Sequence, residues 1–262
     1  IASLREQDTW VHGNNPEAAA AKALDLLRMA VSAVRFARPL TDYRVSMDQE
    51  ALVVGGGVSG MTASLALANA GYQVHLVERS ERLGGNLLDL YYVAEGYNPQ
   101  RLLRDLVNRV RAHQQIITYT RTQLVRQSGH VGHFQSELVT RRPGNLEERI
   151  TLEHGVTILA TGAQETRNHA WLQHPQVITQ RALEEKVIHH PEQIAALKNV
   201  VMIQCVRPEG VEDYCSRVCC TNTIKNAIRI KLFNPACHVS VLYKNIVTYG
   251  FREEFFTEAR RL

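Results

Sequence analysis

The alternation of apolar and polar positions predicts helices and short buried strands along most of the chain. A helix begins at Asn15-Pro16, because Asn is a favoured N-cap and Pro is favoured in the first turn. The helix runs to about residue 37, and Pro39 ends it. Its apolar residues form one stripe at helical spacing, made of Leu24, Leu27, Val31 and Val34.

The same pattern predicts two strand–helix–strand units. In the first unit, residues 51–54 form a short buried strand, 58–71 a helix and 72–78 the next strand. The second unit spans 199–243, and its helix begins near Ser216. Each unit has the order expected of two parallel strands joined by a crossover helix.

An amphipathic helix at 98–113 and a β-meander separate the two units. From 116 to 160 the sequence reads as strands broken by turns at "SG" and "RPGN", and "VTILATGA" is an apolar strand that stops at Gly162. Residues 163–198 are polar and mixed, with a helical "RALEEKVI" and a second helix after Pro191. We interpret this stretch as a linker or a crossing between domains.

Composition narrows the classes of protein. The chain has 262 residues, 45% of them hydrophobic and 21% charged, which is an ordinary globular mixture. The net charge of +4 is scattered, so we do not expect nucleic-acid binding. No apolar run approaches the ~20 residues that span a bilayer, and we expect a cytoplasmic protein. Since the first residue is Ile1 and the last residues look like the middle of a helix, we expect a fragment.

A glycine motif lies between the first strand and its helix. Gly55, Gly57 and Gly60 form G-x-G-x-x-G, in which the first glycine permits a tight turn and the second lets a pyrophosphate approach the backbone. The third glycine allows close packing of the helix on the sheet. Glu78 ends the next strand, where a carboxylate can accept hydrogen bonds from a ribose. Together these features predict a dinucleotide site rather than a tight turn with no ligand.

Further features favour FAD over NAD. Arg79 follows the acid directly, and the paired Gly84 and Gly85 come a few residues later. Thr161 and Gly162 belong to an "ATG" that ends the strand after the meander. This order is typical of flavoproteins with two dinucleotide-binding domains.

Four of the five cysteines lie within 205–220, in the place of the second phosphate loop. The strand at 199–205 ends at Cys205, and Cys215, Cys219 and Cys220 follow in "YCSRVCC". A loop with Gly210 as its only glycine is not expected to bind nicotinamide. Adjacent cysteines fit a tetrahedral zinc poorly but can span two corners of an iron–sulfur cube, so a [4Fe-4S] cluster is favoured over zinc, a redox dithiol or buried thiols.

At this point the chain resembles the A subunit of heterodisulfide reductase and its relatives, which contain flavin and iron–sulfur clusters. The resemblance covers almost the whole chain. Its segments are "REQDTWVH" (5–12), the glycine segment 53–86, "VTILATGA" (156–163), "VITQRALE" (177–184), "VMIQCV" (201–206), "YCSRVCC" (214–220) and "YGFREE" (249–254).

The resemblance implies an electron-transfer subunit with FAD and one [4Fe-4S] cluster, which in some complexes divides an electron pair between two acceptors. The cluster ligands would be Cys205, Cys215, Cys219 and Cys220, and Lys225 would face the flavin and stabilise its anionic reduced form. The implied partners are the other subunits of such a complex and a hydrogenase or formate dehydrogenase as donor, with no membrane span. One departure is Asp8, where the family often has cysteine.

The predicted fold is therefore α/β, with a Rossmann-like FAD-binding domain of thioredoxin-reductase type, a β-meander and a second Rossmann-like unit that carries the cysteines. The predicted parts are an N-terminal helical segment (1–48), the FAD-binding domain (49–165), a linker (166–198) and the second unit (199–262). Two rival functions stay open: a pyridine-nucleotide disulfide oxidoreductase that uses a cysteine pair, and a zinc-stapled scaffold without catalysis.

Overall fold

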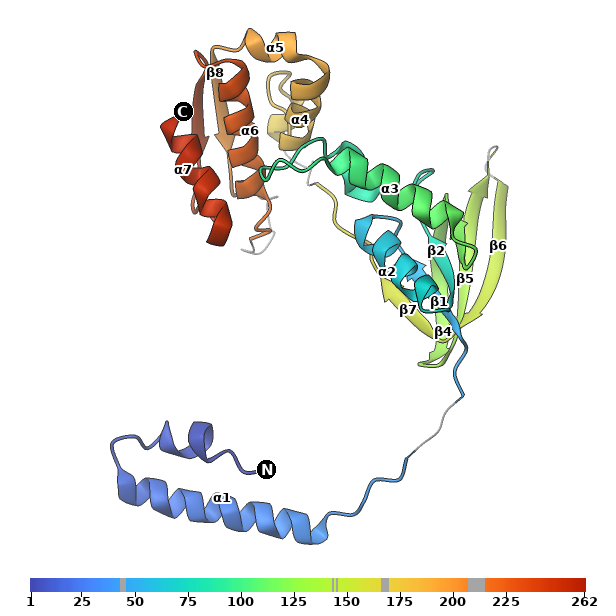
Figure 1. Ribbon diagram of the computed structural model, residues 1–262, viewed down its shortest axis with the longest axis vertical. Coiled ribbons are helices and arrows are strands. Elements are labelled where there is room, and N and C mark those ends of the chain that lie inside the picture. The colour runs from blue at the N-terminus through green and yellow to red at the C-terminus, as the bar shows by residue number, and fades with distance from the viewer. Residues whose placement is uncertain (43–45, 143, 145, 166–169, 207–214) are drawn as a thin grey trace. The chain divides into compact units, whose positions relative to one another are not determined.

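The computed structural model describes every residue except 43–45, 143, 145, 166–169 and 207–214 (Figure 1). The chain divides into two compact units, residues 1–45 and residues 46–262. No helix in the described part of the chain is long and apolar enough to cross a membrane.

Unit 1 contains a short π-helix, η1 (Arg5–Thr9), and the long helix α1 (Pro16–Phe36). The predicted start of α1 is confirmed, because the side chain of Asn15 accepts a hydrogen bond from the backbone N–H of Ala18 at 3.1 Å. None of the residues of α1 is buried, and its apolar stripe is exposed.

The first half of unit 2 is built on a four-stranded parallel sheet in the order β3-β2-β1-β7. This is the strand order of half a Rossmann fold. β2 and β3 lie on one side of β1, and the chain then crosses over to form β7 on the other side of β1. The elements of this half are β1 (Glu50–Val54), α2 (Val58–Asn69), β2 (Gln73–Val77), η2 (Gly85–Asp89), α3 (Pro99–Ala112), β3 (Ile116–Tyr119) and β7 (Val156–Leu159).

Helices cover one face of this sheet and the meander covers the other. Because strand side chains alternate, Val74 and Leu76 of β2 face α2 and α3, while Val77 packs against Leu138 of the meander. The meander is the antiparallel sheet of β4 (Thr122–His130), β5 (His133–Arg142) and β6 (Leu146–His154).

One turn of the meander differs from its prediction. The β4–β5 pairing runs through Ser128 and Gly129 to the pair His130 and His133, so the turn lies at Val131-Gly132 and not at "SG". Gly129 has φ +96° and pairs with Phe134, and a Cβ there would stand 2.1 Å from the carbonyl oxygen of His133, so this glycine is required within the paired strands and does not mark the turn. The predicted "RPGN" turn lies partly outside the described residues.

The second half of unit 2 contains a two-stranded parallel sheet, β8 (Asn199–Ile203) and β9 (His238–Leu242), joined through α6 (Cys219–Phe233). Leu183, Met202 and Ile230 lie at the centre of its core. The remaining elements are η3 (Ala170–Gln173), α4 (Gln180–His189), α5 (Pro191–Ala195), η4 (Gly250–Arg252) and α7 (Glu253–Arg261).

Among the residues that the structure describes, side chains cover one face of the β8–β9 sheet and leave the other exposed. Met202 and its neighbours on that face join the core, whereas Val201, Ile203 and Leu242, on alternate positions, are about half exposed or more. Parallel sheets are normally covered on both faces. The uncovered face is therefore an apolar surface of this unit.

A buried histidine joins two strands of the meander. His154 is fully buried, its Nε2 lies 2.8 Å from Oγ of Ser136, and its Nδ1 lies 3.1 Å from the carbonyl oxygen of Val156. Because a carbonyl only accepts, Nδ1 carries the proton and Nε2 accepts from the Ser136 hydroxyl. Burial lowers the pKa of His154, so the neutral ring is the form that the fold stabilises.

This depressed pKa predicts that acidification weakens the fold. In the unfolded chain His154 takes up a proton as the pH falls below its ordinary pKa of 6.5, while the folded chain resists protonation. The free energy of unfolding should therefore fall between about pH 7.5 and about pH 5.5, and less so in His154→Gln. Urea titrations followed by circular dichroism measure this, with His130→Gln in the exposed turn as the matched control. An equal pH response in both variants would contradict the assignment.

Candidate functional site

The glycine loop lies at the carboxyl end of β1, next to the end of β7. A Cβ on Gly55 would stand 2.2 Å from the carbonyl oxygen of Ala160, and a Cβ on Gly60 would stand 1.8 Å from the carbonyl oxygen of Gly55. Gly55 also has φ +114°, which favours glycine. These two glycines are therefore required by the fold itself.

Gly57 differs from its neighbours. A Cβ there would meet no atom within 4 Å, and its backbone is extended, with φ −76° and ψ −174°. Nothing in the described protein requires glycine at this position. Open space at the N-terminus of α2 is what a pyrophosphate needs in order to approach the backbone, so the cradle fits the phosphates of a dinucleotide.

The paired glycines lie directly beside this space. Gly84 forms an isolated parallel bridge with Gly57, and its backbone N–H donates to the carbonyl oxygen of Gly56 at 2.8 Å. A Cβ on Gly85 would stand 3.1 Å from Cα of Gly57. The structure thus brings together two glycine motifs that are separated by more than a helix and a strand in the sequence.

Glu78 holds the loop in place from the end of β2. Its Oε2 accepts from the N–H of Gly56 and its Oε1 from the N–H of Ser80, both at 2.7 Å. The residue is buried, at 7% exposure. Since each carboxylate oxygen has a second lone pair, Glu78 can still accept hydrogen bonds from a ribose.

The other predicted flavin residues lie at the rim. Thr161 and Gly162 follow β7 and are exposed, and Gly162 has φ +67°. The backbone N of Thr161 lies 3.1 Å from the position of a Cβ on Gly55. Arg79 is exposed and directly follows Glu78.

The cysteines gather loosely around the start of α6. Cys219 and Cys220 are its first two residues, and Cys205 follows β8 with φ +58°, an unusual backbone for a non-glycine residue. Cys215 is exposed. Burial raises the pKa of the Cys220 thiol, and Cys219 and Cys205 lie close enough to raise it further. Within the described residues no three ligating side chains stand at the distances of a metal site.

Two polar atoms next to these cysteines have no hydrogen-bond partner in the described structure. They are Oε1 of Gln204, which precedes Cys205, and Oγ1 of Thr221, which follows Cys220. The first turn of α6 also has no side-chain cap. The hydroxyl of Thr221 and the uncapped N–H groups of α6 can donate to a bound anionic group, whereas the amide oxygen of Gln204 only accepts hydrogen bonds. The residues at the start of α6 are therefore compatible with a thiolate-bound cluster.

Lys225 is not a solvated helix lysine. Its Nζ donates to Oε2 of Glu184 at 2.6 Å and to the carbonyl oxygen of Tyr92 at 2.9 Å, and the side chains of Lys225 and Glu184 are only 3% and 5% exposed. Nζ also lies 4.8 Å from the centre of the Tyr92 ring. Burial lowers the pKa of Lys225, and the ion pair with Glu184 opposes this effect.

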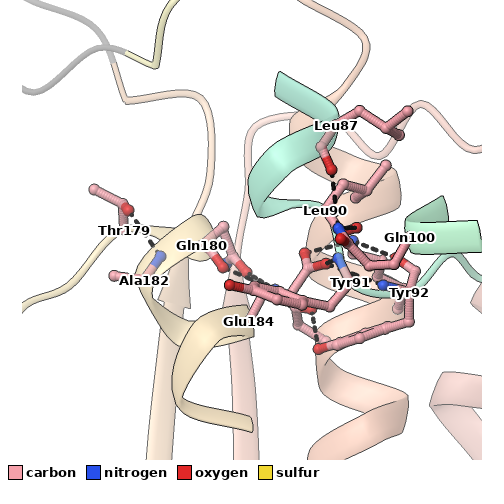
Figure 2. Close-up of polar contacts among 11 residues, drawn as sticks. Leu87, Leu90, Tyr91, Tyr92, Gln100, Thr179, Gln180, Ala182 and Glu184 are labelled. Carbon is pink, nitrogen blue, oxygen red and sulfur yellow. Dashed lines mark hydrogen bonds and ion pairs between the residues drawn. The ribbon is translucent and has the colours of Figure 1, made fainter. Parts of the chain in front are cut away.

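Glu184 of α4 ties this lysine to the flavin-binding half. Its Oε1 accepts from the backbone N–H groups of Tyr91 and Tyr92 at 2.7 and 3.3 Å, as Figure 2 shows. The hydroxyl of Tyr92 donates to Oδ1 of Asn226 at 2.7 Å, and Asn226 in turn donates to Oε1 of Gln180 at 2.8 Å. The network therefore joins the segment after η2 to both α4 and α6.

Sequence reasoning missed Glu184, Tyr92 and Asn226. Glu184 and Glu185 are adjacent acids in one helix, and nothing in their local pattern shows that only the first is buried. The signal that existed was the resemblance segment ending at Glu184. Asp8, the departure from the family pattern, is 1% exposed, and its Oδ1 has no hydrogen-bond partner in the described structure.

Comparison with known proteins agrees with the glycine loop and its acid. Residues 50–167 match the family described as FAD dependent oxidoreductase. The parallel sheet, the loop after β1 and this match define an FAD-binding oxidoreductase domain of Rossmann type. The predicted fold class and the predicted FAD are thereby confirmed.

Curated relatives extend the comparison to nearly the whole chain. The chain is 27% identical to the A subunit of the H(2):CoB-CoM heterodisulfide,ferredoxin reductase from Methanothermobacter marburgensis, over 99% of this chain and 53% of the relative. It is 37% identical to one of the iron-sulfur A subunits of the CoB–CoM heterodisulfide reductase from Methanopyrus kandleri, over 56% of this chain and 23% of the relative. The chain is therefore similar to heterodisulfide reductase A subunits along nearly its whole length, and the predicted resemblance to that family is confirmed.

The relatives are longer than this chain. It spans about half the length of the first relative. That alignment runs over 352 positions, more than the 262 residues of the chain, so the relative has residues within the matched span that have no counterpart here. Among solved structures, bacillithiol disulfide reductase from Bacillus cereus is 13% identical, over 81% of this chain and 65% of its own, with a TM-score of 0.48.

The open space at Gly57 generates a sharp prediction. Gly57→Ala should fold normally, with an unfolding free energy of the flavin-free chain within about 0.5 kcal/mol of the original, but it should bind FAD roughly tenfold more weakly or worse, because the methyl group takes the place of the pyrophosphate. Flavin titration and urea unfolding measure the two effects. The matched control is Gly13→Ala, whose Cβ would make an ordinary 3.5 Å contact. Normal FAD affinity in Gly57→Ala would disprove the cradle.

Proposed function

We propose that this chain is the flavin-dependent electron-transfer module of a heterodisulfide reductase-like complex. The observation that carries the proposal is the parallel β8–α6–β9 unit, in which Cys219 and Cys220 begin the helix where a nucleotide-binding unit would place its phosphate loop. The similarity to heterodisulfide reductase A subunits supports the same electron-transfer function.

In this proposal FAD lies over the glycine loop. Gly55 and Gly60 set the turn, the N-terminus of α2 at Gly57 would hold the pyrophosphate, and Glu78 would accept hydrogen bonds from the ribose. The rest of the proposed FAD site would be lined by Arg79, Gly84, Gly85, Thr161 and Gly162. The support is the arrangement of the loop, its acid and the adjacent glycine pair.

The proposed cluster ligands are Cys205, Cys215, Cys219 and Cys220. When bound, FAD supplies two-electron chemistry and a [4Fe-4S] cluster supplies one-electron transfer. The protein's contribution is the unscreened N-terminus of α6, which favours thiolates and offers N–H donors to sulfur. Because burial holds the Cys220 thiol protonated, metal binding there would release a proton.

Lys225 is the proposed residue that acts on the flavin. Its ammonium group would stabilise the anionic reduced form, and Glu184 sets the position and the charge of that group. Division of an electron pair between two acceptors is the finer form of this proposal. The proposed partners are the other subunits of the complex, with a hydrogenase or formate dehydrogenase as electron donor.

The rival function, a pyridine-nucleotide disulfide reductase, needs a glycine-rich loop that binds the nicotinamide dinucleotide. Residues 204–218 contain a single glycine, Gly210. The comparisons favour the heterodisulfide reductase relationship instead. A zinc scaffold would need four ligands in tetrahedral order, which adjacent cysteines supply poorly.

Metal analysis tests the cluster. Chain purified without oxygen should contain about one FAD and about four iron and four sulfide atoms. Cys220→Ala should lose the iron and keep the flavin, because its glycine loop is untouched. Cys237→Ala is the control, since Cys237 is fully buried in the core of the second half, away from the other four. One zinc per chain, equal iron loss in the control, or rapid NAD(P)H oxidation would count against the proposal.

The Lys225–Glu184 pair generates a second prediction. Lys225→Met leaves a buried carboxylate without its cation, and should lower the unfolding free energy by about 3–5 kcal/mol. The double variant with Glu184→Gln should recover most of that loss. If Lys225 acts on the flavin, both the single and the double variant should lower the flavin reduction potential, by roughly 30 mV, a tenfold change for a two-electron couple.

The two readouts separate structure from chemistry. Recovery of stability together with recovery of the potential would show that Lys225 is only structural. Lys198→Met is the control, because Lys198 is exposed on the same half of the chain. Potentiometric titration and urea unfolding of each variant provide the measurements.

A further inference from the structure

Arg181 of α4 contacts two side chains of η2, the short helix that begins at the second glycine of the pair. Its Nη1 donates to Oδ1 of Asn86 at 3.3 Å, and its Nη2 donates to Oδ2 of Asp89 at 2.5 Å. Residues three apart lie on the same face of a 3₁₀ helix, and a guanidinium presents its donors as a rigid planar fork. Arg181 therefore spans the single turn of η2 and binds both acceptors at once.

Asn86 extends this contact to the loop after β7. Its Nδ2 donates to the carbonyl oxygen of Ala163 at 2.9 Å, and Ala163 directly follows Gly162. Asn86 itself directly follows Gly85, which lies beside Gly57. One side chain thus joins the segment of the paired glycines to the loop after β7, which are two sides of the proposed FAD site.

The start of α4 is held from α6, so Arg181 has a fixed position. Thr179 caps α4 with its side chain, as Figure 2 shows. Nε2 of Gln180 donates to Oγ1 of Thr223 at 3.2 Å, and Nδ2 of Asn226 donates to the carbonyl oxygen of Gln180 at 3.2 Å. The first turn of α4 therefore carries Arg181 on a backbone that α6 anchors.

The ion pair of Arg181 and Asp89 is partly exposed, since the two side chains are 27% and 54% exposed. Such a pair adds little to the stability of the fold, because water and salt screen its charges. Its effect on binding is larger, since a ligand that needs ordered loops loses affinity by the free energy required to order them. Loss of Arg181 should therefore change FAD affinity more than it changes the stability of the flavin-free chain.

We propose that Arg181 is a positioning residue for FAD. Through Asn86 it holds the segment of Gly84 and Gly85 at a fixed distance from the loop after β7, and so keeps two sides of the site in place before FAD binds. The inference rests on the proposed FAD site. It adds to that site a residue of α4, which lies beyond the predicted FAD-binding domain (49–165).

FAD titration of the flavin-free chain tests the role of Arg181. Arg181→Met should raise the dissociation constant for FAD roughly tenfold, mainly through faster release, and should leave the urea midpoint of the flavin-free chain unchanged within error. Arg181→Lys keeps the charge without the fixed fork, so it should show most of the same loss.

Lys186→Met is the matched control. It removes one positive charge from the same helix, and Lys186 contacts Gln193 of α5 at 2.9 Å instead of η2. Its FAD affinity should stay within about twofold of the original. An equal loss in Lys186→Met, or full affinity in Arg181→Lys, would show that only the charge of α4 matters and would overturn the positioning role.

A double variant tests whether Arg181 acts through Asn86. Asn86→Ala alone should weaken FAD binding by a factor similar to that of Arg181→Met, because both break the same chain of hydrogen bonds. The double variant should bind FAD no more weakly than the weaker single variant. Two effects that multiply would show independent roles and contradict the proposal.

The Gly57→Ala variant separates this inference from the proposed FAD site. Normal FAD affinity in Gly57→Ala would overturn both. Weak binding in Gly57→Ala together with normal binding in Arg181→Met would overturn only the positioning role. Tighter FAD binding in Arg181→Met would show that the Asn86 bridge obstructs the site, and unchanged affinity with a lower urea midpoint would show that Arg181 is only structural.

Discussion

A buried carboxylate requires hydrogen-bond donors or a cation beside it, and those of Glu184 come from both halves of unit 2. Its two oxygens accept hydrogen bonds from the backbone of Tyr91 and Tyr92 and from the ammonium of Lys225. An unpaired charge at this depth would cost several kcal/mol, so the segment after η2 cannot leave α4 and α6 without a large penalty. The flavin-binding half and the cysteine-bearing half are therefore held together at this point by electrostatics.

The fold could be predicted where local signals and periodicity agree. Asn15 and Pro16 start α1, the glycine loop separates β1 from α2, and the alternating strands of the meander pair as expected. The β4–β5 turn was placed wrongly, because "SG" is the stronger local turn signal and only the pairing of the two strands places the turn at Val131-Gly132. The width of the buried face of α3 could not be predicted from the amphipathic pattern, because Leu103 is buried while its neighbour Leu102 is 47% exposed.

The candidate site could be predicted in part: the residues of a local motif could be found, and those joined by long-range contacts could not. Gly57 and Glu78 belong to a contiguous motif whose chemistry dictates its spacing. Glu184 and Asn226 join through contacts across more than 40 residues, and no local pattern encodes such a contact. Lys225 was found through the family resemblance, yet its burial against Tyr92 comes from tertiary packing. The roles of the cysteines depend on a bound group and stay predictions.

The position of β7 has a consequence for how the protein is made. β1 pairs with β7 from Ala51 to Val156 onwards, and Gly55 lies against Ala160, so roughly one hundred residues separate the two sides of the flavin-binding edge. During synthesis the glycine loop emerges long before the strand that completes it. Closure of so long a loop is slow and comes late in folding. The edge of the sheet at the glycine loop is therefore complete only after β7, which follows the meander in the chain, has paired with β1.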